Sequence, residues 1–69
     1  MAFELTGYGE QEAAKIEGVN TPERAVVVYL YEMKRPVEFD EILGETRMSD
    51  EKALHVMRRL VNGGYVVEN

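Results

Sequence analysis

Hydrophobic and polar positions in the second half of the chain follow the spacing of two amphipathic helices. Phe39, Ile42 and Leu43 stand at positions i, i+3 and i+4, which predicts a short helix with one apolar side. Val37, just before it, is expected to add a single bridging strand residue. A longer helix is predicted over residues 49–62. Five of its residues are expected to line the apolar side: Ala53, Leu54, Met57, Leu60 and Val61.

The ends of helix 49–62 carry residues that favour helix initiation and termination. Ser49 can accept a hydrogen bond from an unpaired backbone N–H of the first turn. Asp50 and Glu51 place negative charge where the helix dipole is positive. Gly63 is expected to take the left-handed conformation that ends many helices. A short strand is predicted after it, in the sequence YVVEN of residues 65–69.

Residues 21–35, with the sequence TPERAVVVYLYEMKR, are predicted to form the first long helix. Thr21 is a good N-cap, and Pro22 fits the first helical position because its missing N–H would be unpaired there anyway. Pro36 then stops the helix. The β-branched run 26–28 favours a strand instead. The helix is preferred because both of its ends carry capping signals.

Apolar residues surround helix 21–35 on nearly all sides. One side is expected to hold Val26, Tyr29, Leu30 and Met33. Three further apolar residues point elsewhere: Val27, Val28 and Tyr31. Because a helix of this kind is covered on more than one side, we expect either the N-terminal segment or a second copy of the chain to pack there. These three residues are the predicted dimer interface.

The N-terminal twenty residues carry weaker patterns. Phe3 and Leu5 alternate with polar neighbours and predict a short strand. The following GYG is expected to end this strand as a turn, and it is no phosphate-binding loop because no Gly-Lys-Ser/Thr follows. Residues 10–17, EQEAAKIE, can form two helical turns that stop at Gly18.

Length and composition narrow the class of protein. The 69 residues correspond to one domain, which we divide into an N-terminal extension, residues 1–20, and a core of residues 21–69. A domain of this size buries only about 60% of its unfolded surface, so its core is marginal. The absence of cysteine excludes disulfide bonds and thiolate metal sites. No signal peptide follows Met1 and no apolar run approaches the roughly 20 residues that span a bilayer, so we expect a cytoplasmic protein without a membrane segment.

Residues 36–68 carry a resemblance to a known family. Their sequence, PVEFDEILGETRMSDEKALHVMRRLVNGGYVVE, resembles the core of winged helix-turn-helix transcription regulators of the small bacterial and archaeal MarR and ArsR kinds. The matching positions are Phe39, Ile42, Leu43, Met48, Ser49, Leu54, Met57, Leu60, Gly64, Tyr65 and Val66. The resemblance implies a mainly α fold with a small β element. Helix 21–35 would be the first of three core helices, and the wing would be short or truncated.

The wing is where the sequence departs from that family. A winged helix has a second and a third strand joined by a loop that often bears basic residues, whereas room remains here for one strand, YVVEN. Two arrangements follow. Either the wing is lost, or the N-terminal strand, FELT of residues 3–6, pairs with YVVEN in its place.

Positive charge is concentrated on the predicted recognition helix. Residues 47–62 carry +4 − 2 = +2, whereas the other residues carry +4 − 11 = −7 and the whole chain −5. In the family that the sequence resembles, the outward side of this helix enters the DNA major groove. The resemblance therefore implies a sequence-specific regulator that binds double-stranded DNA, and we expect a homodimer. The expected DNA contacts are Arg47, Ser49, Lys52, His55, Arg58 and Arg59.

Other features favour a different function. Asp50 and Glu51 stand where the helix would approach DNA and would repel phosphate, although capping is the simpler account of them. The charge of −5 and the missing wing suit a winged-helix module that binds a protein instead of DNA. A third hypothesis is that the chain is a domain that only assists a larger complex through its own dimerisation. A single histidine and no metal-ligand spacing give no support to catalysis, so we expect no enzyme, metal or cofactor.

Overall fold

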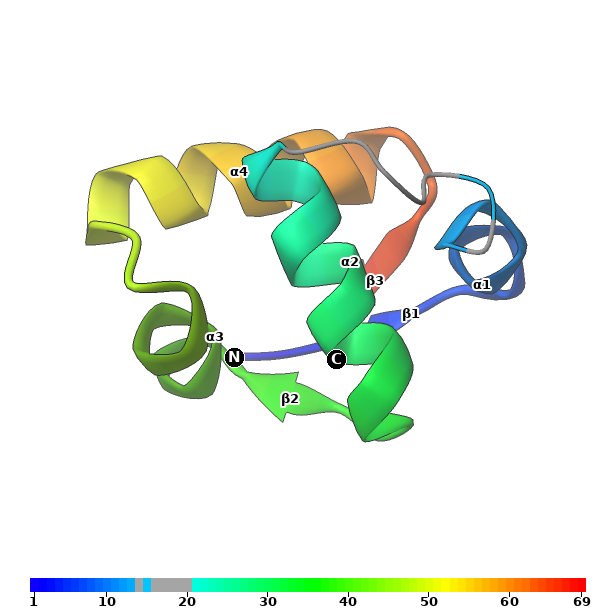
Figure 1. The fold of residues 1–69 in the computed structure, drawn as a ribbon, viewed down its shortest axis with the longest axis horizontal. Helices are drawn as coiled ribbons and strands as arrows, with labels where there is room; N and C mark the ends of the chain where they lie inside the picture. The colour runs from blue at the N-terminus through cyan, green and yellow to red at the C-terminus, as the bar shows by residue number, and fades with distance from the viewer. Residues whose placement is uncertain (14, 16–20) are drawn as a thin grey trace.

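The computed structural model describes residues 1–13, 15 and 21–69 of the chain. Within these residues it is a small compact α/β domain with four helices and a three-stranded antiparallel sheet (Figure 1). The elements are β1 (Ala2–Leu5), α1 (Gly7–Ala13), α2 (Pro22–Met33), β2 (Val37–Glu38), α3 (Phe39–Thr46), α4 (Asp50–Asn62) and β3 (Val66–Glu68). The three helices predicted from the sequence after residue 20 are therefore all present.

The N-terminal strand lies at the centre of the sheet, whose order is β2-β1-β3. Leu5 pairs with Val66 on one side, and Phe3 pairs with Val37 on the other. Of the two arrangements left open by the sequence, the pairing of FELT with YVVEN is confirmed. Because β1 joins both edge strands, the N-terminal residues belong to the body of the domain and are more than an extension.

Helix α1 begins earlier than the sequence suggests. GYG was expected to form a turn, but Gly7 is already the first helical residue. Thr6 explains the difference, because its side-chain oxygen accepts a hydrogen bond from the N–H of Gly9 at 3.0 Å and so caps the helix. The helix ends at Ala13, and the predicted stop at Gly18 lies outside the described residues.

Helix α2 forms as predicted despite its β-branched run. The Thr21 side chain accepts from the N–H of Arg24 at 3.2 Å, and Pro22 occupies the first helical position. The helix ends at Met33, slightly before the predicted boundary at Arg35. Lys34 ends it in the left-handed conformation, with φ of 54°, and its N–H donates to the Leu30 carbonyl at 3.2 Å.

The core lies between α2, the sheet and α4. Among the described residues, ten buried apolar side chains form it: Phe3, Val26, Val27, Leu30, Val37, Ile42, Val56, Met57, Leu60 and Val66. The second side of α2 is covered by α1 and β1, so the N-terminal segment fills the place for which a second copy was the alternative. The prediction of a dimer contact at Val27 is wrong, because this side chain is packed inside its own chain and is 2% exposed.

The apolar side of α4 is rotated from the predicted one. The buried residues are Ala53, Val56, Met57 and Leu60, whereas Leu54 and Val61 are each 37% exposed. The helix also ends differently, because Gly63 is right-handed with φ of −80° and Gly64, with φ of +82°, takes the left-handed conformation. The N-cap is confirmed, since Ser49 Oγ accepts from the N–H of Lys52 at 3.2 Å.

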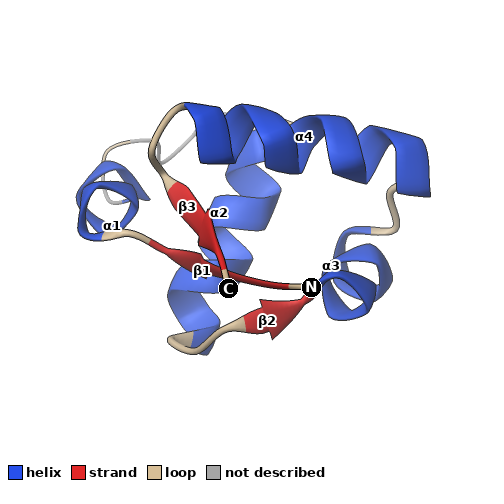
Figure 2. Ribbon diagram, turned by 180° about the vertical axis from the view of Figure 1, so that it is seen from behind, coloured by secondary structure: helices blue, strands red, loops and turns tan. Residues whose placement is uncertain are grey.

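Seen from behind, the three strands lie in front of α2, and α4 runs along one side of the sheet (Figure 2). The face of the sheet that is turned away from α2 has none of the described helices against it. Glu38 and Val67 are exposed on this face. None of the helices that the structure describes is long and apolar enough to cross a lipid bilayer.

Candidate nucleic-acid interface

Helix α4 lies along the surface of the domain, and α3 precedes it across a short turn (Figure 1). Arg47 ends α3 in the left-handed conformation, with φ of 59°, and its N–H donates to the Leu43 carbonyl at 2.8 Å. The side-chain oxygen of Thr46 accepts from the N–H of Met48 at 3.4 Å. These bonds fix the direction in which α4 leaves the turn.

All the residues predicted to contact DNA are exposed. They are Arg47, Ser49, Lys52, His55, Arg58 and Arg59. The cap bond that Ser49 makes to the helix leaves its Oγ at the N-terminus of α4. Arg47 lies in the turn before α4, and Lys52, His55, Arg58 and Arg59 lie on the exposed surface of α4.

The basic residues of α4 divide between two sides of the helix. At about 100° per residue, Glu51, His55 and Arg58 follow a stripe directly opposite the buried residues. Lys52 and Arg59, seven positions apart, follow a second stripe on the side of α2. Arg58 and Arg59, both expected to contact DNA, therefore lie on different sides of the helix: Arg58 opposite the buried residues and Arg59 toward α2.

On the side of α2, basic and acidic side chains meet. Arg59 lines a hollow of about 320 Å³ together with Glu23 and Arg24 of α2. The Nε of Arg59 lies 3.9 Å from an Oε of Glu23, a distance that gives a weak, solvent-screened ion pair. Arg24 was missed by the sequence analysis, because nothing in the local sequence indicates that it lies beside a residue 35 positions later.

On the opposite side of α4, the surface is apolar. Leu54 and Val61 line a groove of about 240 Å³ between α4 and the edge of the sheet. We call this the α4–β3 groove. Its other lining residues are Met1, Phe3, Met57, Arg58, Asn62 and Glu68. From the sequence, Leu54 and Val61 are predicted to lie on the buried side of α4, and the structure corrects this prediction.

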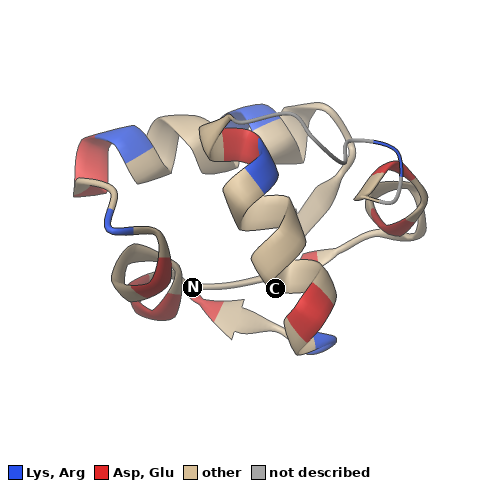
Figure 3. Cartoon of the chain, viewed as in Figure 1, with Lys and Arg blue, Asp and Glu red and all other residues tan. Residues whose placement is uncertain are grey.

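Acidic side chains dominate the rest of the molecule. Figure 3 shows Lys and Arg on α4, on the turn before it and near both ends of α2, and Asp and Glu on α1, on α3, on both ends of α2 and at the start of α4. Helix α3 carries Asp40, Glu41 and Glu45 and no basic residue. The surface beside α4 would therefore repel a phosphate backbone, and α4 is the element that would attract it.

One acid of α3 is held by a cation. Arg35 Nη2 lies 2.9 Å from Oε2 of Glu41, and Nη1 lies 3.4 Å from Oε1. These hydrogen bonds lower the pKa of the Glu41 carboxyl below its usual value. The pair ties the end of α2 to α3, and it directs Arg35 away from α4.

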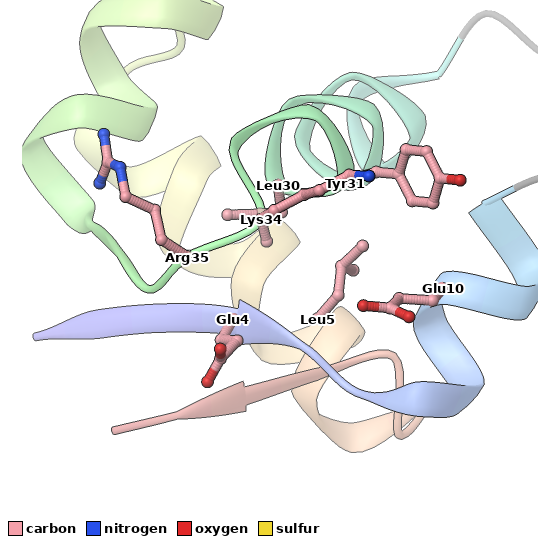
Figure 4. A pocket seen from close by; sticks show the side chains of 7 residues that line it. All are labelled: Glu4, Leu5, Glu10, Leu30, Tyr31, Lys34 and Arg35. Atoms are coloured by element: carbon pink, nitrogen blue, oxygen red, sulfur yellow. The ribbon is translucent and has the colours of Figure 1, made fainter.

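A third hollow, of about 190 Å³, lies between β1, α1 and the end of α2. Figure 4 shows Leu5 and Glu10 on one side of it and Arg35 extending away toward α3. Lys34 Nζ lies 5.8 Å from the centroid of the Tyr31 ring, as in a cation–π contact. The basic side chains at this hollow thus have partners of their own, and it offers less to an anion than α4 does.

Within the described part of the chain, no group of three or more His, Asp or Glu side chains is arranged to hold a metal ion. No protein-family model matches the sequence, and neither a curated protein nor a solved structure matches the chain.

Proposed function

We propose that the chain is a winged-helix transcription regulator that binds double-stranded DNA in the cytoplasm, with α4 as its recognition helix. The order α2, β2, α3, α4, β3 is that of a winged helix, and β1 occupies the centre of the sheet where the last strand of that fold would lie. The turn between α3 and α4 directs α4 along the surface, as a helix-turn-helix requires.

The observation that carries the proposal is the gathering of exposed cations on α4 and the turn before it. Four of the eight basic residues lie there: Arg47, Lys52, Arg58 and Arg59. An α-helix about 10–12 Å across fits a major groove about 12 Å wide. Arg58 and His55 would then face the base edges, and Lys52 and Arg59 would contact phosphates on the flank.

The acidic residues restrict where DNA can bind. Asp40 and Glu45 on α3 repel phosphates, so contact is limited to α4 and the start of α2. Asp50 and Glu51 lie at the end of α4 that enters the groove, where a carboxylate can accept a hydrogen bond from cytosine N4. Binding would be weak on arbitrary DNA and would depend on the sequence of the site.

The test is fluorescence anisotropy of labelled duplexes over a series of salt concentrations. Candidate duplexes are selected from a random pool with the wild-type protein. With about three phosphate contacts, the slope of log K against log salt should be about −3. The double variant Lys52→Gln with Arg59→Gln should reduce the magnitude of that slope by about 2 and weaken binding of all sequences alike.

The matched control removes the same charge elsewhere. Lys15→Gln with Lys34→Gln also deletes two exposed cations, but from a turn after α1 and from the end of α2. If both double variants weaken DNA binding equally, the effect comes from net charge, and α4 is not the recognition helix. If selection recovers no duplex even at low salt, the proposal of a DNA-binding regulator fails.

A second candidate function is a winged-helix module that binds a protein. The exposed apolar residues Leu54 and Val61 on α4 favour it, because a helix that reads DNA needs no apolar stripe beside its basic one. A pull-down that recovers one stoichiometric protein and no DNA would place this candidate first.

A further inference from the structure

We propose that the α4–β3 groove is the site at which a second copy of the chain binds. Its centre is apolar, with Leu54 and Val61 each 37% exposed and Met1 54% exposed. These side chains converge on one groove and are not scattered, which is the pattern of an interaction surface. The domain is also small, and domains with marginal cores commonly gain stability by association.

Charge at the edges of the groove selects the second copy as its occupant. Arg58 of α4 and Glu68 of β3 both line the groove, so one cation and one anion come from the two elements that border its apolar centre. Neither takes part in the ion pairs found among the described residues. A two-fold interface must be complementary to itself. A symmetry axis along the groove sets each Arg58 against Glu68 of the other copy, with apolar centre on apolar centre.

This surface differs from the one predicted on α2. Val27 is inside the core and Val28 is partly buried, which leaves Tyr31 as the exposed apolar residue there. Tyr31 is 43% exposed and has Lys34 over its ring. Tyr31 is therefore a matched control: it is as exposed as Leu54 and Val61, but it lies on another helix.

Association at this groove has a consequence that rests on the proposed DNA function. A major groove about 12 Å wide admits one helix about 10–12 Å across. A second chain packed along the Leu54 and Val61 side of α4 would prevent α4 from entering it. Self-association and DNA binding would then exclude each other, and dimerisation would lower the apparent affinity of the protein for DNA.

The experiment is sedimentation equilibrium of the full chain over a concentration series. The wild type should show a monomer–dimer equilibrium. Leu54→Gln with Val61→Gln should raise the dimer dissociation constant by at least about tenfold, which corresponds to about 1.4 kcal/mol. Tyr31→Gln should leave it unchanged. Circular dichroism of each variant checks that it remains folded.

Charge reversal gives an independent test that does not alter the apolar centre. Arg58→Glu alone should weaken the dimer by repulsion from Glu68, and Arg58→Glu combined with Glu68→Arg should restore it. A wild type that stays monomeric throughout, or a dimer that dissociates only on Tyr31→Gln, would overturn the proposal. A double reversal that restores nothing would contradict the two-fold arrangement and overturn it too.

Fluorescence anisotropy tests separately whether dimerisation and DNA binding exclude each other. Free monomer still increases with total protein, so dimerisation should broaden the wild-type titration and shift it to higher concentration. The Leu54→Gln, Val61→Gln variant should therefore half-saturate the labelled duplex at a lower total protein concentration than the wild type. If neither wild type nor variant binds DNA but the dimer responds to the substitutions as expected, the proposed DNA function is wrong. The proposal that a second copy binds at the groove is then still supported. If both bind DNA equally while the wild type is dimeric, the mutual exclusion is wrong.

Discussion

The hydroxyl of Thr6 donates a hydrogen bond of 2.6 Å to the carbonyl of Gly64, a residue 58 positions later in the chain. The same oxygen accepts from the N–H of Gly9 at 3.0 Å, and the N–H of Thr6 donates to the Tyr65 carbonyl at 3.0 Å. One residue therefore ends β1, caps α1 and holds the turn that follows α4. The position of β3, and with it one edge of the α4–β3 groove, depends on this contact.

Replacing Thr6 by valine should destabilise the domain by about 1–3 kcal/mol. The isosteric side chain cannot donate to the Gly64 carbonyl or cap α1, and a lost cap and a lost hydrogen bond each cost about 1 kcal/mol. Urea unfolding followed by circular dichroism measures the change. Thr6→Ser keeps the hydroxyl and should lose much less. Equal loss in both variants would show that the methyl group contributes as much as the hydroxyl, and would contradict the assignment of the effect to the two hydrogen bonds.

Two glycines in helices should respond in opposite directions to the same substitution. Gly9 is buried in α1, and a Cβ there would collide with the backbone carbonyl of Tyr65, so Gly9→Ala should destabilise by about 1–3 kcal/mol. Gly44 in α3 has open space around its Cα, so Gly44→Ala should stabilise by about 0.5–1 kcal/mol. Thermal unfolding of both variants tests the pair. A stable Gly9→Ala protein would mean that α1 can move away from the turn before β3.

The local signals in the sequence were sufficient for much of the fold. The caps of Thr21 and Ser49 and the i, i+3, i+4 spacing of α3 are properties of a few neighbouring residues, and the structure shows all of them. GYG begins a helix because Thr6 caps the Gly9 N–H, a local signal of the same kind that the sequence prediction missed. The bond that holds Thr6 to the Gly64 carbonyl joins residues 58 positions apart, and no local pattern contains it.

The candidate site was harder to predict than the fold. The exposed cations of α4 follow from its sequence, but their division between two sides depends on which residues the core takes. The core takes Val56 and leaves Leu54 and Val61 at the surface, because the buried side of α4 faces α2 and the sheet together. Arg24 lies near Arg59 through the crossing of α2 and α4, which is a tertiary relationship.

The Arg35–Glu41 ion pair should make a small part of the free energy of unfolding depend on pH in the acidic range. Because Arg35 lowers the pKa of Glu41 in the folded chain, this contribution is present above the usual glutamate pKa. It is lost as the pH falls through the lowered pKa. NMR titration of the Glu41 carboxyl carbon measures the effect, and Arg35→Gln should raise the pKa of Glu41 toward its usual value.

The control for this titration removes a cation from another helix. Lys52 lies on α4 and makes no ion pair to Glu41 among the described contacts, so Lys52→Gln should leave the titration of Glu41 unchanged. A similar rise in both variants would assign the lowered pKa to the overall charge of the molecule. Both partners are substantially exposed, so added salt should reduce the difference between wild type and Arg35→Gln.

Ser49 allows stability and DNA binding to be separated at one position. Its Oγ caps α4 by accepting from the Lys52 N–H, so Ser49→Ala should cost about 1 kcal/mol in urea unfolding. Aspartate is an equally good N-cap, and Ser49→Asp should therefore preserve stability. It also adds a negative charge at the N-terminus of α4, where a bound duplex would bring phosphate.

Anisotropy at low salt should accordingly rank the DNA affinities wild type, then Ser49→Ala, then Ser49→Asp, whereas unfolding should place Ser49→Ala last. The opposite order of the two variants in the two assays is the informative result, because a general loss of structure would weaken both properties together. Ser49→Asp binding DNA as tightly as the wild type would show that the start of α4 does not approach the backbone. Recognition would then have to be assigned to the Arg58 and Arg59 end of the helix.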